Sequence, residues 1–311
     1  MNAANGLPPD GAAAPASPAP PPVQKPRRRR RRRLLALLAI LAVACLLTGS
    51  CSADRLVLGT DPGAPADTGG ATRRLIERDG ITVECWVARS PGARGQAGSP
   101  AREPEALILY FTGKGTRAET WTAVVADGWG GRPVEVWGVN YPGFGGTTGP
   151  PRMARVGPSA LVAYDGAREA AAGKPVFVQG ASFGTVPALH VAARRPVDGV
   201  ILHKPPPLRQ LILGQYGWWN LWLFAGPVAA GVPADLDSLA NARRCSAPAV
   251  LVLHGADQVI APKYQRRIAD GYAGPKRVID FAGARHDDPL SREVGEKNDA
   301  AIEWMLRSGG P

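Results

Sequence analysis

The stretch from Val176 to Thr185 constrains the fold most, because an apolar run ends there in Gly-x-Ser-x-Gly. Residues 186–195, which follow, have the composition of a helix. The pattern predicts a strand, a sharp turn that carries Ser182, and a helix. Gly180 and Gly184 suit such a turn because a side chain at either position would obstruct it. The helix would direct its free N–H groups toward Ser182, which favours a nucleophile at this position.

Apolar runs alternate with helix-like segments along most of the chain. Strands are expected at residues 81–88, 106–111, 134–139, 176–178, 200–202, 250–253 and 277–281. This alternation predicts an α/β fold in which helices flank a mostly parallel central sheet and ligands bind at the carboxyl ends of the strands. The chain has 311 residues, enough for one such domain but too few for two large ones.

The alternating pattern is interrupted at residues 204–246, after the expected strand at residues 200–202. Pro205-Pro206-Pro207 opens this segment, and Trp218, Trp219, Trp222 and Phe224 cluster within it. One interpretation is an excursion that only packs on the domain. The alternative, which we favour, is a small lid that forms an apolar wall over the site.

The net charge of +11 is concentrated at the N-terminus. Residues 1–53 hold eight basic residues and one acidic residue, and seven of the basic ones form the run from Arg27 to Arg33. The rest of the chain is only slightly basic and has no basic stripe interleaved with aromatic residues. We therefore expect no nucleic-acid partner.

The N-terminal composition predicts the domain organisation. Residues 1–33 form a Pro/Ala-rich and polyarginine region that we expect to be disordered. Residues 34–53 are uncharged and begin with an apolar run, which predicts an export signal or a membrane anchor. Residues 54–71 are rich in Gly, Pro and Asp, as in a linker, and the folded domain is expected to span residues 72–308.

Three fates of the export segment compete. Thr48-Gly49-Ser50-Cys51 resembles a loose lipobox in which Cys51 would be lipidated, although Leu47 lies one position too early. Uncleaved, residues 34–53 are just long enough for a signal anchor. Cleavage without lipidation would release a soluble exported protein. We favour membrane association, with the domain on the non-cytoplasmic side because the arginine run should stay in the cytoplasm.

A serine nucleophile needs a histidine base, and the chain has only four histidines. His286 follows the last predicted strand, in a loop that can reach Ser182, and is our candidate base. His203, which ends another strand, is the second candidate. His254 is interpreted as structural, and His190 lies too far along the helix after Ser182.

The carboxylate that would orient the base is assigned to Asp257, in the turn after the strand at residues 250–253. Asp235 and Asp237 in the 204–246 segment are competitors. Asp287 and Asp288 lie too close to His286 in sequence to orient it easily. The resulting order, serine, aspartate and then histidine, is typical of one fold.

Four separated stretches resemble the α/β-hydrolase fold, and more specifically serine aminopeptidases and acyl-protein depalmitoylase-like hydrolases. The stretches are Phe111-Thr112-Gly113-Lys114-Gly115, Asn140-Tyr141-Pro142-Gly143-Phe144-Gly145, Gly180 to Gly184, and His254 to Asp257 with His286. The resemblance covers about residues 72–308. It implies an oxyanion hole formed by the backbone N–H groups of Phe183 and Lys114. The sequence departs from the family because Thr112 and Lys114 stand where its members usually have His and Asn.

The resemblance implies a serine hydrolase that cleaves a carboxylic ester or a thioester through an acyl-enzyme. A serine peptidase of the same fold and a catalytically silent envelope binding protein are the alternatives. The tryptophans of the 204–246 segment hint at an apolar small-molecule acyl substrate. We expect no cofactor and no metal, because no Cys or His spacing suggests a metal site and the glycine patterns match no nucleotide-binding motif. A Cys85–Cys245 disulfide is disfavoured, since the fold would place the two residues far apart.

Overall fold

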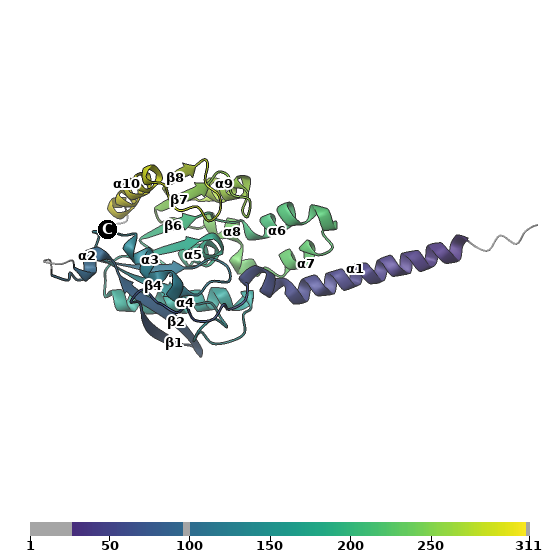
Figure 1. The fold of residues 1–311 in the computed structure, drawn as a ribbon, viewed down its shortest axis with the longest axis horizontal. Coiled ribbons are helices and arrows are strands. Elements are labelled where there is room, and N and C mark those ends of the chain that lie inside the picture. The colour runs from purple at the N-terminus through teal and green to yellow at the C-terminus, as the bar shows by residue number, and fades with distance from the viewer. Residues whose placement is uncertain (1–26, 96–99, 309–311) are drawn as a thin grey trace, which may run out of the picture. The chain divides into compact units, whose positions relative to one another are not determined.

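A computed structural model describes residues 27–95 and 100–308, apart from the side chains of residues 27–29 and 49–51. The chain divides into two units, Met1–Ala42 and Val43–Pro311. Helix α1 (Arg27–Leu58) belongs to both units. The description below concerns the second unit, which carries the sheet (Figure 1).

The centre of the domain is an eight-stranded sheet with the order β1-β2-β4-β3-β5-β6-β7-β8. The strands are β1 (Thr72–Arg78), β2 (Ile81–Arg89), β3 (Ala106–Phe111), β4 (Val134–Val139), β5 (Val176–Ala181), β6 (Gly199–His203), β7 (Ala249–His254) and β8 (Lys276–Phe281). Strand β2 pairs antiparallel with β1 and β4, and all other pairs are parallel. The prediction of a mostly parallel sheet is confirmed.

The sequence pattern missed one strand, β1, whose sequence Thr-Arg-Arg-Leu-Ile-Glu-Arg is mostly polar. An edge strand pairs on one side only, and most of the residues of β1 are exposed. No apolar run is therefore needed to bury it. The central strands β3 and β7, by contrast, are buried at every position, as expected for strands covered on both faces.

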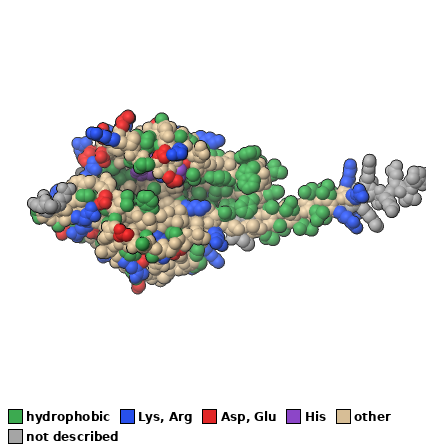
Figure 2. All heavy atoms as spheres, viewed as in Figure 1, with side chains coloured by type: hydrophobic (Ala, Val, Ile, Leu, Met, Phe, Trp, Pro, Cys, Tyr) green, Lys and Arg blue, Asp and Glu red, His purple; other side chains and the backbone are tan. Residues whose placement is uncertain are grey.

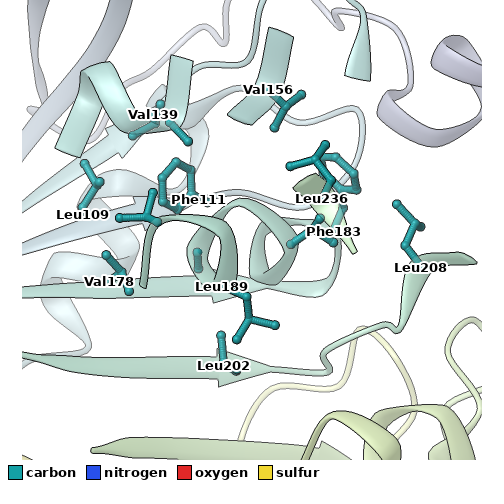
Figure 3. Packing of buried hydrophobic residues seen from close by; sticks show 14 of the residues in the cluster. Leu109, Phe111, Val139, Val156, Val178, Phe183, Leu189, Leu202, Leu208 and Leu236 are labelled. Atoms are coloured by element: carbon teal, nitrogen blue, oxygen red, sulfur yellow. The ribbon is translucent and has the colours of Figure 1, made fainter. Parts of the chain in front are cut away.

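Helices cover both faces of the sheet (Figure 1). Helices α3 (Thr122–Asp127) and α10 (Arg292–Ser308) pack on one face. Helices α4 (Met153–Ala171), α5 (Thr185–Ala192) and α9 (Pro262–Gly271) contribute to the core on the other. The short helix α2 (Pro91–Arg94) and the 3₁₀ turn η1 (Ala118–Thr120) complete this part of the chain. Figure 3 shows the larger core, in which Leu109, Phe111 and Val178 of the strands meet Leu189 of α5.

The end of α1 differs from the linker predicted at residues 54–71. Ala53, Val57 and Leu58 are buried in the main core. Asp54 accepts a hydrogen bond from the first backbone N–H of α4, at Met153, with an O···N distance of 2.7 Å. The Leu58 carbonyl accepts another from the Gly115 N–H at 2.8 Å. The core therefore begins before the predicted boundary at residue 72, because these contacts come from residues distant in sequence.

By length and composition, no single helix among the described residues could cross a membrane. Two stretches of α1, Arg30–Thr48 and Ser52–Leu58, pass such a test only together, as a bent pair. The lipidation predicted at Cys51 concerns a side chain that lies outside the described residues.

The predicted insertion lies between β6 and β7. It contains α6 (Leu208–Tyr216), η3 (Trp218–Asn220), α7 (Ala225–Ala230), η4 (Ala234–Leu236) and α8 (Ser238–Ala242). We call the part from α6 to α7 the lid. Leu208 and Leu236 anchor the insertion in the main core, near Phe183 (Figure 3). The insertion is therefore built onto the carboxyl edge of the sheet, where the candidate site lies.

Candidate active site

Ser182 lies at a strained turn between β5 and α5. Its φ of 54° is in the left-handed region, which non-glycine residues rarely adopt. A Cβ at Gly180 would come within 2.4 Å of the Gly184 carbonyl oxygen, and one at Gly184 within 2.0 Å of the Phe111 carbonyl oxygen. Both glycines are therefore required by close packing of the backbone. The structure has the strand, turn and helix that the sequence predicts here.

Asp257 and His286 meet at the carboxyl edge of the sheet. Asp257 follows β7 and His286 follows β8, and these strands are paired neighbours. The His286 Nδ1 atom lies 2.7 Å from Asp257 Oδ2. A carboxylate can only accept here, so Nδ1 carries the proton and Nε2 keeps a free lone pair. The imidazole is thus in the tautomer that a general base requires.

The Asp257 carboxylate is held in place by further donors. Its Oδ1 accepts hydrogen bonds from the backbone N–H groups of Val259 and Ile260, at 2.8 and 2.9 Å. Its Oδ2 also accepts one from Gln265 Nε2 at 3.0 Å. Burial by itself would raise the pKa of Asp257, but the hydrogen bonds from His286 and these N–H groups outweigh it and lower that pKa. Asp257 is therefore ionised at neutral pH and its orientation is fixed.

Two side chains, Lys204 and His254, hold the backbone at His286. Lys204 Nζ donates to the His286 carbonyl at 2.8 Å. His254 Nδ1 donates to the carbonyl of the preceding residue, Arg285, at 2.7 Å. Burial lowers the pKa of both Lys204 and His254. The interpretation of His254 as structural agrees with this role, whereas no local pattern marked Lys204.

Among the described residues, none of the other candidate histidines and aspartates is hydrogen-bonded to Ser182 or His286. His203 pairs with Ala181 in the sheet register, and burial lowers its pKa to about 3, so its imidazole is neutral. His190 Nδ1 donates to the Asp235 carbonyl at 2.8 Å. Asp237 caps α8 by accepting from two backbone N–H groups. Of the carboxylates considered as partners for His286, the structure brings Asp257 to it.

The turn after β3 lies beside Ser182. A Cβ on Gly113 would be 4.0 Å from the Ser182 Cβ atom. The hydroxyl of Thr112 donates to the Thr116 carbonyl at 3.0 Å, and the hydroxyl of Tyr141 donates to the Thr112 carbonyl at 2.6 Å. These bonds fix the turn that precedes Lys114. The buried Thr112 thus has a structural role in this turn.

Asn140, the residue after β4, bridges two buried carboxylates. Its Nδ2 donates to the carboxylates of Glu84 and Glu119, at 2.8 and 2.9 Å, and its Oδ1 accepts from the Ala118 N–H at 2.7 Å. Both glutamates are buried. An aspartate at this position would add a third buried negative charge and remove the donor that bridges the other two. Asparagine therefore matches this polar cluster.

A cavity of about 420 Å³ opens beside Ser182. Ser182, Phe183 and Lys114 line it together with the lid and the end of α1. Most of its wall is apolar and includes Leu208, Leu211, Phe224, Val228 and Ile260. Its volume is in the range of small-molecule sites. The cavity can therefore hold an apolar group beside Ser182.

Among the described residues, no group of three or more His, Cys, Asp or Glu residues could hold a metal ion. Cys85 and Cys245 are buried free thiols, and burial raises the pKa of each to about 12. Thiols with so high a pKa are poor nucleophiles at neutral pH. Neither thiol is therefore suited to act as a nucleophile in this structure.

No protein-family model and no curated protein matches this sequence. Solved structures do match the fold. Est1E from Butyrivibrio proteoclasticus is 17% identical, with 76% of this chain and 98% of that chain covered and a TM-score of 0.57. An esterase from Pyrococcus furiosus is 13% identical, with 81% and 96% covered and a TM-score of 0.56. A bacterial membrane phospholipase A is 17% identical, with 88% and 99% covered and a TM-score of 0.50.

These identities are too low to transfer an activity, but the fold agrees over nearly the whole length of each neighbour. They do not single out the serine aminopeptidase-like or depalmitoylase-like branch, which stays a prediction. The strand order, the turn at Ser182 and the neighbours lead to the same conclusion. The chain has the α/β-hydrolase fold.

Proposed function

We propose that this protein is a serine hydrolase that cleaves a carboxylic ester or a thioester. The observation that carries the proposal is the hydrogen-bonded pair of Asp257 and His286, at the same edge of the sheet as the strained Ser182. Such strain is characteristic of a nucleophile that must stand clear of its strand. The apolar cavity beside Ser182 supplies the place for the substrate.

The chemistry follows from this arrangement. The Ser182 Oγ attacks the carbonyl carbon while His286 Nε2 takes the hydroxyl proton. Negative charge develops on the carbonyl oxygen, where the backbone N–H groups of Phe183 and Lys114 would stabilise it. His286 then returns the proton to the departing alcohol or thiol. A water molecule, activated by His286, releases the carboxylic acid and regenerates Ser182.

The cavity favours an ester with an apolar acyl group. Leucine, valine and phenylalanine side chains of the lid dominate its wall, and Lys114 is its charged lining residue. Burying each methylene of an acyl chain there contributes about 0.8 kcal/mol. We favour an ester or a thioester over an amide because an alkoxide or a thiolate is a better leaving group than an amine anion.

A catalytically silent binding protein is the second candidate. Its support is the replacement of the usual histidine and asparagine by Thr112 and Lys114. The oxyanion donors are backbone groups, however, and Thr112 has a defined structural role in their turn. The paired Asp257 and His286 are difficult to explain in a protein without catalysis.

Labelling with a fluorophosphonate probe tests the activity. Wild type should be labelled and Ser182→Ala should not. Ser238→Ala is a matched control, since its buried hydroxyl has no hydrogen-bond partner among the described residues, and it should be labelled like wild type. Absence of labelling in wild type, or equal labelling of Ser182→Ala, would contradict the proposal.

We further propose that the protein is exported and held at a membrane by its N-terminal segment, with the hydrolase domain on the non-cytoplasmic side. The arginine run followed by the apolar residues 34–47 supports this topology. Mass spectrometry of the mature N-terminus distinguishes the three fates of the segment. A lipidated Cys51, an intact N-terminus and a cleaved unmodified chain correspond to lipoprotein, anchor and soluble export.

A further inference from the structure

The lid exposes an unusual number of large apolar side chains. Trp218, Trp219, Leu221 and Trp222 are 68%, 63%, 73% and 50% exposed. We call these four residues the lid surface. They lie on η3 and in the turn that leads to α7, where Figure 2 shows hydrophobic side chains gathered. A contiguous apolar patch of this kind marks an interaction site.

The lid surface is held in its outward conformation. Trp222 Nε1 donates to the Leu213 carbonyl at 2.9 Å, and a Cβ on Gly217 would come within 2.2 Å of the Trp222 ring. Asn220 Nδ2 donates to the Tyr216 carbonyl at 2.8 Å. Leu221 and Trp222 both have positive φ values, 50° and 60°. The backbone is thus strained at the two positions whose apolar side chains are exposed to solvent.

The lid surface is continuous with the candidate active site. Trp219, one of its members, and the neighbouring Tyr216 also line the cavity that contains Ser182. The hydroxyl of Tyr216 donates to the Val259 carbonyl at 3.1 Å, two residues beyond Asp257. A partner that binds the lid surface therefore meets the mouth of the cavity.

The chain itself indicates which partner this is. Helix α1 carries the apolar run at residues 34–47 and ends with Leu56 and Val57 in the cavity wall. The segment proposed to lie in a membrane is thus joined by a short piece of chain to the entrance of the site. Three indoles in the lid surface match the side-chain type enriched at membrane–water interfaces.

We infer that the lid surface docks into the interface of a lipid bilayer, so that the cavity opens toward the acyl chains and takes up an amphiphilic ester from the membrane. This inference rests on the proposed hydrolase function and adds the substrate class to it. Hydrolysis breaks the acyl–oxygen bond of the ester, adds water across it, and returns the carboxylic acid and the alcohol to the bilayer.

The test variant is Trp218→Gln combined with Leu221→Asn. Neither residue lines the cavity, and asparagine tolerates the left-handed backbone at position 221. The matched control is Trp121→Gln combined with Val124→Gln. These two residues, at the start of α3, are 46% and 55% exposed and lie outside the lid.

Tryptophan fluorescence reports on docking. All eight tryptophans follow residue 85, so the signal comes from the folded domain and not from α1. Full-length protein is reconstituted into vesicles of phosphatidylcholine with brominated acyl chains. The tryptophan fluorescence of wild type and of the control should be quenched strongly. W218Q/L221N should lose most of this quenching, because Trp219 and Trp222 no longer reach the acyl chains. Equal quenching of all three proteins would overturn the inference.

Two esters separate docking from catalysis. W218Q/L221N should hydrolyse a water-soluble acetate ester within about twofold of wild type but a long-chain ester embedded in vesicles about tenfold more slowly. If wild type hydrolyses neither ester while quenching is normal, the hydrolase proposal fails and the docking inference does not. If light scattering in detergent shows a dimer that W218Q/L221N abolishes, with quenching unchanged, a second copy is the partner and the inference fails.

Discussion

Replacing Asp257 with asparagine tests the proposed catalytic arrangement most directly. The Oδ1 atom of Asp257 accepts from two backbone N–H groups, and Oδ2 accepts from His286 Nδ1 and Gln265 Nε2. An asparagine can supply only one accepting oxygen. Because the two backbone donors cannot rotate, its oxygen should face them and its NH₂ group should face His286. That arrangement favours the imidazole with the proton on Nε2, which cannot accept the proton of Ser182.

The expected loss is therefore large in catalysis and moderate in stability. A wrong tautomer costs about 10⁴-fold in kcat in Ser-His-Asp enzymes. Placing the NH₂ group against the Gln265 Nε2 donor costs about 1–3 kcal/mol of folding free energy. Since the folded state lowers the pKa of Asp257, the contribution of its carboxylate is complete above the ordinary pKa of about 3.9 and is lost as the pH falls below it. The stability difference should accordingly shrink in acid.

The assay measures kcat with a water-soluble ester near pH 7 and thermal unfolding from neutral pH down to about pH 3. Asp237→Asn is the matched control. Asp237 caps α8 through the backbone N–H groups of Leu239 and Ala240, and asparagine caps a helix equally well. It should change neither property. If D257N retains kcat within tenfold of wild type, the assignment of Asp257 as the partner that orients His286 is wrong.

Three further predictions concern the turn at Ser182, the hydrogen bond from Lys204 to the His286 carbonyl, and the cavity. Gly184→Ala should destabilise the protein by about 3 kcal/mol, because its Cβ would meet the Phe111 carbonyl oxygen at 2.0 Å. The loss should appear as a fall in the denaturation midpoint. Gly113→Ala is the control and should be tolerated, since the nearest atoms to its Cβ lie at 4.0 Å. Lys204→Met removes the hydrogen bond to the His286 carbonyl and should lower kcat about fivefold with little change in KM, and rescue by Lys204→Arg would support a positioning role. An equal loss in both Lys204 variants would argue against that role. Val228→Phe narrows the cavity and should lower the ratio of long-chain to short-chain ester hydrolysis about tenfold; an unchanged ratio would show that acyl chains bind elsewhere.

The parts of the site that the sequence could predict are those with a local physical cause. Ser182 could be recognised because Gly-x-Ser-x-Gly between an apolar run and a helix is a local pattern, and Gly180 must clear the Gly184 carbonyl only four residues away. Asp257 and His286 could be proposed because each follows an apolar strand, and parallel strands bring their carboxyl ends to one edge. The order of the three residues then limited the fold to one candidate.

The residues that hold Asp257 and His286 in place had no such local signal in the sequence. Gln265 is an ordinary position of α9, and only the approach of that helix to β7 makes it a donor to Asp257. The bond from Lys204 to the His286 carbonyl joins residues 82 positions apart. The polar strand β1 likewise becomes a strand only by pairing with β2.

The sequence by itself thus determined the α/β architecture, the turn at Ser182 and the candidate residues around it, because short-range sterics and strand periodicity suffice for these. Only the tertiary structure decided that the end of α1 belongs to the core, that the lid encloses an apolar cavity beside Ser182, and which groups hold His286. These features depend on packing between segments far apart in the chain, and burial at such contacts is not encoded in any one segment.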